Sequence, residues 1–180
     1  MIELENKKRI LFSENDIQIR VKEISTILRS SYSDLEDIVI IGVMKGAINF
    51  TIDIAKEINR SVVMDWLSIS SYREGDRQGE LRLLKDIEID IKDKHVVVIE
   101  DILDSGRTLD FIRNLLIRRS PKSLKICVLL KKEDSQRYDI NPDFIGFHLN
   151  NIHWVGGYGI DYNEKYRNLK NIYEIEHKSI

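Results

Sequence analysis

The stretch that decides the fold is VVVIEDILDSGRTL, residues 96–109. It opens with four apolar residues, which indicate a strand buried on both faces, as is typical of a parallel sheet. Two adjacent acids, Glu100 and Asp101, follow this strand, and a third acid, Asp104, begins a short turn toward a helix. Ligands of open α/β sheets bind beyond the carboxyl ends of the strands, so the sequence points to a site at this turn.

Further strands and helices alternate on both sides of this stretch. The apolar runs 38–43 and 124–130 indicate two more buried strands, and residues 47–58 and 109–116 carry apolar side chains at helical spacing. The alternation of strand and helix predicts an α/β fold with a parallel sheet.

Two segments fall outside this alternation. Residues 71–80 are polar, contain two glycines and are interpreted as a mobile hairpin loop, of the kind that serves as a lid on such scaffolds. After Pro142 short strands and turns indicate a small hood over the strand ends. Since no repeat or linker is visible, we expect a single domain over 1–180, with a core at about 35–140 and a hood from 1–15 and 141–180.

Composition excludes several classes of protein. The 180 residues carry 28 Lys and Arg against 30 Asp and Glu, a net charge of −2, which argues against a protein built to coat nucleic acid. No secretory signal is visible, and no apolar run approaches the ~18 residues of a membrane span. The single cysteine, Cys127, lies in an apolar run and cannot form an internal disulfide, so we expect a buried thiol and a cytoplasmic location.

The turn from Asp104 to Thr108 has the features of a phosphate cradle. Backbone N–H groups gather at a helix N-terminus, Gly106 allows close approach, and Ser105 and Thr108 supply hydroxyl groups. The turn is neither a Walker loop nor a dinucleotide fingerprint, and the acids beside it suit ribose hydroxyls or Mg²⁺. The simpler alternative is that Asp104 is a helix N-cap and that Glu100 and Asp101 form a solvated strand end.

The segment EDILDSGRT, residues 100–108, resembles the phosphoribosyl pyrophosphate (PRPP) motif of the type I phosphoribosyltransferases. Other segments, in the same order, resemble the hypoxanthine-guanine branch of that family: GVMKGA at 42–47, SSY at 70–72, LLKK at 129–132, DFIGF at 143–147, WV at 154–155 and GYGIDYNEKYRNL at 157–169. The resemblance implies a parallel sheet with a small hood, transfer of a phosphoribosyl group from PRPP to a 6-oxopurine, a Mg²⁺ requirement and a homodimer or homotetramer. It implies neither a nucleic-acid nor a membrane partner.

The same resemblance assigns roles to single residues. Asp104 would be the proton acceptor near purine N7, and the 5′-phosphate would be bound by the whole turn, which comprises Asp104, Ser105, Gly106, Arg107 and Thr108. Glu100 and Asp101 would hold the ribose hydroxyls and Mg²⁺.

For the base, the resemblance assigns Lys132 to the exocyclic oxygen, with Lys131 as an alternative one residue away. Trp154 would stack on the purine, the Val155 backbone would pair with its edge, and Asp161 would bind a second Mg²⁺ near the 2-position.

For pyrophosphate it assigns Lys45, Gly46 and Arg167, with the Met44–Lys45 peptide as a candidate for the cis form. Ser71 and Tyr72 would close over the reaction centre and exclude water.

Some residues depart from the family pattern, and two other functions stay open. Gly156 stands where the family has a second valine, and Arg107 replaces a more common Asn or Lys; both leave the base preference and affinity undecided. The alternatives are a phosphoribosyltransferase for xanthine or adenine, and a regulator with this fold that binds RNA. The latter needs a basic face, which the net charge disfavours.

Overall fold

The computed structural model describes residues 7–32, 37–74, 77–133, 135–152 and 154–175 of the chain. Its elements in chain order are β1 (Lys7–Phe12), α1 (Glu14–Ser30), β2 (Ile38–Met44), α2 (Ile48–Glu57), β3 (Val63–Glu74), β4 (Arg77–Lys85), β5 (His95–Leu103), α3 (Arg107–Ile117), β6 (Ser123–Lys132), β7 (Phe144–Leu149), β8 (Val155–Gly156) and β9 (Ile172–Ile175). None of the described helices is long and apolar enough to cross a membrane.

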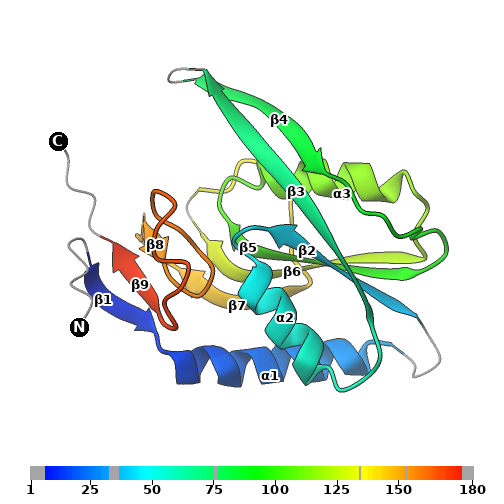
Figure 1. Ribbon diagram of the computed structural model, residues 1–180, viewed down its shortest axis with the longest axis horizontal. Helices are drawn as coiled ribbons and strands as arrows, with labels where there is room; N and C mark the ends of the chain where they lie inside the picture. The colour runs from blue at the N-terminus through cyan, green and yellow to red at the C-terminus, as the bar shows by residue number, and fades with distance from the viewer. Residues whose placement is uncertain (1–6, 33–36, 75–76, 134, 153, 176–180) are drawn as a thin grey trace.

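A six-stranded sheet in the order β4-β3-β2-β5-β6-β7 forms the centre of the molecule. All neighbouring pairs are parallel except β3 and β4, which pair as an antiparallel hairpin at one edge. Helices α1 and α2 cover one face of this sheet and α3 covers the other (Figure 1). The predicted α/β fold with a parallel sheet is confirmed.

Burial on both faces explains why the central strands are continuously apolar. Along β2, Ile38 and Ile40 pack with α1 and α2, whereas Val39 and Ile41 pack with α3. Successive side chains of a strand point to opposite faces, so every position of such a strand needs an apolar residue.

The hood is a second, three-stranded sheet in the order β1-β9-β8, in which both pairs are antiparallel. It lies at one end of the central sheet and joins the start of the described chain to its end (Figure 1).

The hood is smaller than the sequence indicated, because β7 belongs to the central sheet. Phe144–Leu149 pairs in parallel with β6, and the Asp143 carboxylate accepts a hydrogen bond of 2.8 Å from the backbone N–H of Ile126. The inward-facing side chains of β7 alternate with outer ones, as in a strand that closes the edge of a sheet.

The polar segment 71–80, interpreted as a loop, forms the outer part of the β3–β4 hairpin. Strand β3 continues to Glu74 and β4 begins at Arg77. Backbone pairing in an antiparallel hairpin needs no apolar side chains once the hairpin extends beyond the helices, so hydropathy alone does not reveal these strands.

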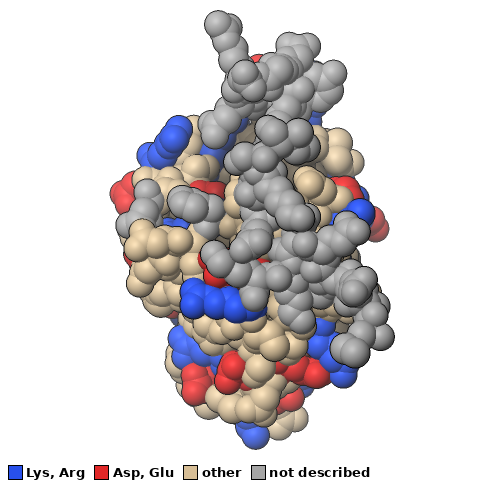
Figure 2. All heavy atoms as spheres, turned by 90° about the vertical axis from the view of Figure 1, so that its left-hand side faces the viewer, with Lys and Arg blue, Asp and Glu red and all other residues tan. Residues whose placement is uncertain are grey.

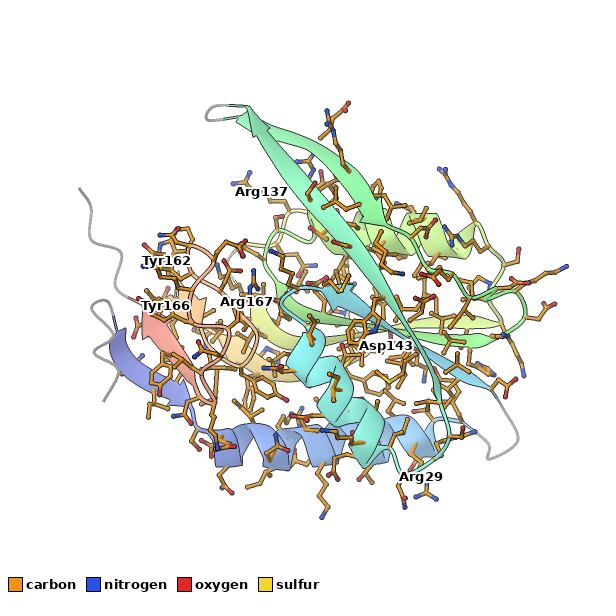
Figure 3. The ribbon with its side chains drawn as sticks, viewed as in Figure 1. Arg29, Arg137, Asp143, Tyr162, Tyr166 and Arg167 are labelled. Atoms are coloured by element: carbon orange, nitrogen blue, oxygen red, sulfur yellow. The ribbon has the colours of Figure 1, made fainter. Side chains whose placement is uncertain are left out.

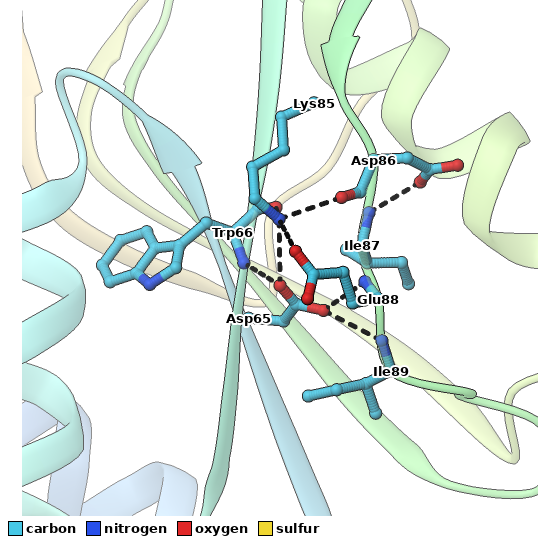
Figure 4. Close-up of polar contacts among 7 residues, drawn as sticks. All are labelled: Asp65, Trp66, Lys85, Asp86, Ile87, Glu88 and Ile89. Atoms are coloured by element: carbon cyan, nitrogen blue, oxygen red, sulfur yellow. Dashed lines mark hydrogen bonds and ion pairs between the residues drawn. The ribbon is translucent and has the colours of Figure 1, made fainter.

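A buried carboxylate holds the base of this hairpin. Asp65 accepts backbone hydrogen bonds from Trp66 at 2.7 Å, Glu88 at 2.6 Å and Ile89 at 3.0 Å, and Lys85 lies 3.5 Å away (Figure 4). Burial acts to raise the pKa of Asp65, but these hydrogen bonds and the Lys85 charge outweigh it and leave the pKa below its ordinary value. The ionised carboxylate thus connects β3 to the chain that follows β4.

Candidate active site

The turn between β5 and α3 is open to an anion. The N-cap of α3 is Gly106, which has a φ of 87° and supplies no side chain to the helix. The alternative reading of Asp104 as the N-cap is therefore wrong, and its carboxylate is available for other contacts. An uncapped helix N-terminus presents N–H donors and the positive end of the helix dipole.

Asp104 and Lys132 meet across the ends of two neighbouring strands. Lys132 Nζ lies 3.0 Å from Asp104 Oδ2, and the lysine side chain is only 17% exposed. Burial acts to raise the pKa of Asp104, but contacts with Ser135 and Lys132 and the charges of Lys132 and Arg137 outweigh it and lower the pKa. Lys131 instead lies 3.3 Å from Glu133, so of the two candidate lysines Lys132 is the one beside Asp104.

These two residues line a cavity of about 450 Å³, whose walls are formed by Asp104, Lys132, Ser135, Leu149, Asn151, Ile152 and Trp154. Trp154 is 45% exposed and stands edge-on to Tyr162, with 5.7 Å between the ring centroids. It is therefore not a residue of the hood core, and its ring is accessible from the cavity. Val155 follows it and is buried in β8. The cavity combines apolar walls with one cation and one anion, as small-molecule sites commonly do.

The two acids at the end of β5 differ in environment. Glu100 is 8% exposed, and its Oε2 atom has no hydrogen-bond partner among the described residues. Burial, together with the adjacent charge of Asp101, raises the pKa of Glu100. Glu100 is thus not a solvated strand end.

Asp101 connects this strand to the loop after β2. A Cβ atom at Gly46 would lie 1.9 Å from Asp101 Oδ2, so only glycine allows this approach. The Met44–Lys45 peptide in the same loop is cis, as expected. The loop is in turn covered by the hood, since a Cβ atom at Gly159 would lie 2.4 Å from the carbonyl oxygen of Gly46.

The hood brings the remaining charged candidates together. Arg167 donates a hydrogen bond of 2.9 Å to the carbonyl oxygen of Gly159 and lies 2.5 Å from Asp161. Glu164 links the hood to the loop after β2, because its carboxylate lies 3.2 Å from Lys45 of that loop and 3.5 Å from Arg167 of the hood. Figure 3 shows Arg167 and Tyr162 on the same end of the molecule. Lys45, Arg167 and Asp161 therefore belong to one charged cluster.

The predicted metal ligands do not form a single group. Glu100 interacts with Asp101, whereas Asp161 pairs with Arg167. Among the described residues, three or more acidic, histidine or cysteine side chains nowhere gather in an arrangement suited to a metal. For the predicted lid, Ser71 and Tyr72 lie in β3, and their side chains are outside the described part of the structure.

Sequence analysis missed Glu164 and the segment 135–140, which lies beside the turn of residues 104–108. Glu164 could have been found from its position three residues before Arg167, in a segment that already carried the resemblance. The segment 135–140 has no motif of its own and is brought to the turn only by the fold.

Comparisons with known proteins agree with this geometry. Residues 13–163 match the family model described as a phosphoribosyl transferase domain. The chain is 40% identical over 178 residues to a hypoxanthine-guanine phosphoribosyltransferase of Aquifex aeolicus, covering 98% of this chain and 99% of the relative. It is also 40% identical over 163 residues to the Bacillus subtilis protein of that name, covering 90% and 89% of the two chains.

Solved structures give the same result. A hypoxanthine phosphoribosyltransferase of Staphylococcus aureus superposes with a TM-score of 0.91 at 36% identity, covering 98% of this chain and 95% of the other. The Trypanosoma cruzi hypoxanthine phosphoribosyltransferase, solved in complex with the product IMP, superposes with a TM-score of 0.89 at 32% identity and covers 98% of each chain. The turn, the cavity, the hood and these relatives together establish that the chain belongs to the phosphoribosyltransferase family, and within it to the hypoxanthine-guanine phosphoribosyltransferases.

Proposed function

We propose that the protein serves purine salvage by transferring the 5-phosphoribosyl group of PRPP to hypoxanthine or guanine, forming IMP or GMP and releasing pyrophosphate. The observation that carries this proposal is the pair of Asp104 and Lys132 in one cavity with the exposed ring of Trp154, beside an uncapped helix N-terminus. The cavity suits a flat base with a polar edge, and the helix terminus suits a phosphate.

Lys132 would recognise the base, and Asp104 would activate it. Lys132 would donate to the 6-oxo group, whereas the 6-amino group of adenine is itself a donor and would be rejected. The lowered pKa keeps Asp104 ionised near neutral pH, so it can accept the N7 proton. As N9 bonds to ribose C1, the bond from C1 to pyrophosphate breaks, and its electron pair leaves with the pyrophosphate.

The turn of residues 104–108 would hold the 5′-phosphate through its backbone N–H groups and the hydroxyls of Ser105 and Thr108. Trp154 would stack on the base, while the backbone of Val155 would meet the base edge. Stacked aromatic side chains and backbone donors orient a substrate without new charges.

The leaving pyrophosphate would be met by Lys45, the backbone of Gly46 and Arg167. Lys45 and its partner Glu164 are 65% and 70% exposed, so this ion pair is a weak one that a polyanion can replace. Ser71 and Tyr72 on the β3–β4 hairpin would then exclude water from the reaction.

The acids at the end of β5 fit Mg²⁺. Mg²⁺ is usually held by one or two carboxylates together with substrate phosphates and water, not by a cage of protein ligands. The buried Oε2 of Glu100, without a partner among the described residues, and the adjacent Asp101 meet that description, and Asp161 would approach a second ion. Mg²⁺ would neutralise charge on PRPP, while Glu100 and Asp101 would also hold the ribose hydroxyls.

The alternative of an RNA-binding regulator finds no support on the hood side of the molecule. Figure 2 shows Lys and Arg interspersed with Asp and Glu there, without a continuous basic area among the described residues. We infer a homodimer or homotetramer and a cytoplasmic location, the latter because the chain has a single cysteine, Cys127, which is buried and can form no internal disulfide.

The test is a spectrophotometric assay with hypoxanthine, guanine, xanthine and adenine, each with PRPP and Mg²⁺. We expect turnover of hypoxanthine, guanine or both, and none of adenine. Turnover of xanthine alone would mean that the substrate is xanthine and not hypoxanthine or guanine. Failure with all four bases, together with tight binding of an RNA leader, would overturn the enzyme function.

A further inference from the structure

The segment 135–140, which follows β6, lies directly against the phosphate turn. The backbone N–H groups of Arg137 and Tyr138 both donate to the carbonyl oxygen of Ser105, at 2.9 and 3.1 Å. A Cβ atom at Gly106 would lie 3.2 Å from Tyr138 Cβ, so the two segments are in van der Waals contact. The turn is thus built from two parts of the chain.

Side chains also hold the backbone of this segment. Gln136 Nε2 donates to the carbonyl oxygen of Ile140 at 2.6 Å, and Arg113 of α3 donates to that of Asp139 at 3.2 Å. These contacts place the backbone of Arg137 beside the turn without using its side chain. A substitution of Arg137 would therefore remove the guanidinium and leave the loop in place.

The Arg137 side chain is exposed, and no acidic side chain pairs with it among the described residues. The positive charge of Arg137 nevertheless acts on the turn, since this charge is one of the causes that lower the pKa of Asp104. In Figure 3 Arg137 and Arg167 both lie toward the left-hand side of the view.

The charges at the turn indicate a role for the Arg137 side chain. Asp104 places a negative charge at the same turn that must receive a phosphate dianion, and the helix dipole supplies only about half a positive charge. Lys132 is paired with Asp104. Besides Arg107 of the turn itself, a second cation would help to balance the dianion, and a guanidinium can bind phosphate oxygens through two parallel hydrogen bonds.

We propose that Arg137 is a side-chain ligand of the 5′-phosphate, contributed to the turn by the segment after β6. This inference rests on the proposed function and adds a residue that recognises the phosphorylated ribose of PRPP and of the nucleotide product.

The test compares ligands with and without the phosphate. In Arg137→Gln we expect the KM for PRPP and the Kd for IMP to rise by ~10-fold, which corresponds to the loss of one charge-assisted hydrogen bond. The KM for hypoxanthine and the affinity for inosine, measured by competition, should stay within ~2-fold. Arg137→Lys should recover part of the loss, since it keeps the charge without the planar fork.

Arg118→Gln is the matched control, because Arg118 is an exposed arginine at the far end of α3. It should change none of these constants, and all three variants should melt at the wild-type temperature. Equal losses for IMP and inosine, or unchanged constants in Arg137→Gln, would overturn the role of Arg137. An inactive wild-type enzyme would instead overturn the proposed function, so the two failures are distinguishable.

Discussion

At the scale of single residues, the pair of Asp104 and Lys132 would determine the chemistry of the cavity that both line. The two side chains come from different elements and lie 3.0 Å apart. Burial acts to raise the pKa of Asp104, but the contacts with Ser135 and Lys132 outweigh it and hold the pKa below its ordinary value, so the carboxylate stays ionised. An ionised acceptor beside a cationic donor is the arrangement that a 6-oxopurine with an N7 proton requires.

We expect Asp104→Asn to lower kcat by ~10²-fold or more, because an amide cannot accept the proton. Steady-state kinetics with hypoxanthine and PRPP measures the effect, and Glu23→Gln, a change at an exposed acid of α1, serves as the control. Wild-type turnover in Asp104→Asn would assign the proton acceptor to another residue.

Lys132→Ala should raise the KM for hypoxanthine while leaving the KM for PRPP within a few-fold, because of the two substrates the lysine would contact only the base. Without its charge the pKa of Asp104 rises toward the ordinary value, so the acid limb of the pH–rate profile should move to higher pH. Lys131→Ala removes the neighbouring lysine, which faces Glu133, and should retain wild-type kinetics. The reverse pattern would assign the base contact to Lys131.

At the scale of elements, the β3–β4 hairpin depends on a polar contact at its base. Asp65 satisfies three backbone N–H groups, two of them in the chain after β4. The hairpin therefore has a fixed base, although its outer strands are polar.

Asp65→Asn should lower the free energy of unfolding by about 2 kcal/mol, because a neutral amide accepts these hydrogen bonds less well and leaves one donor poorly satisfied. The depressed pKa of Asp65 means that its stabilising effect is complete above the unfolded-state pKa near 4 and is lost as the pH falls through the folded-state pKa. Urea denaturation at several pH values should thus show the difference between wild type and variant shrinking below about pH 4.

Glu88→Gln is the control for that series, since Glu88 also contacts Lys85 but is 83% exposed. Its effect on stability should be small at every pH. A loss in Glu88→Gln as large as that in Asp65→Asn would place the stabilising interaction in the lysine pair and not in the backbone contacts of Asp65.

At the scale of the whole molecule, the site is completed by contact between the hood and the central sheet. The hood turn at Gly159 rests on the loop at Gly46, and that loop rests on Asp101 at the end of β5. Three segments far apart in the sequence thus meet without room for a side chain.

Gly159→Ala should raise the KM for PRPP and lower the melting temperature. The new methyl group would collide with the carbonyl oxygen of Gly46, and the residue has a φ of 99°, which disfavours a side chain. Gly156→Ala is the matched control in the same hood, because its Cβ would meet only ordinary contacts at 3.5 Å or more. If both variants changed the KM and the melting temperature equally, the effect would come from any added methyl group in the hood and not from the contact between Gly159 and Gly46.

EDTA should abolish turnover, and excess Mg²⁺ should restore it, because PRPP is polyanionic and the site supplies few carboxylates. The melting temperature of the free protein should not change with EDTA, since the described residues form no cage of three or more acidic ligands. A large drop in the melting temperature would indicate a structural metal instead.

The fold was largely predictable, and its exceptions have a common cause. Buried strands such as β2 and β6 can be predicted from their continuous apolar residues, because both of their faces are covered. Residues 71–80 were expected as a hairpin loop, without the strands that reach Glu74 and begin again at Arg77, and the place of β7 in the central sheet was not foreseen. Backbone pairing at the edge of a sheet depends on neighbouring strands and leaves little trace in local hydropathy.

The sequence by itself determined the α/β architecture, the position of the turn between β5 and α3, and the family, because these depend on local patterns within short segments. Only the tertiary structure decided that Lys132 and not Lys131 faces Asp104, and that Glu164 links Lys45 to Arg167. Only it placed Arg137 at the turn. Such pairings join residues distant along the chain, and their distances are set by how strands, hood and loops pack, which no local pattern of residues encodes.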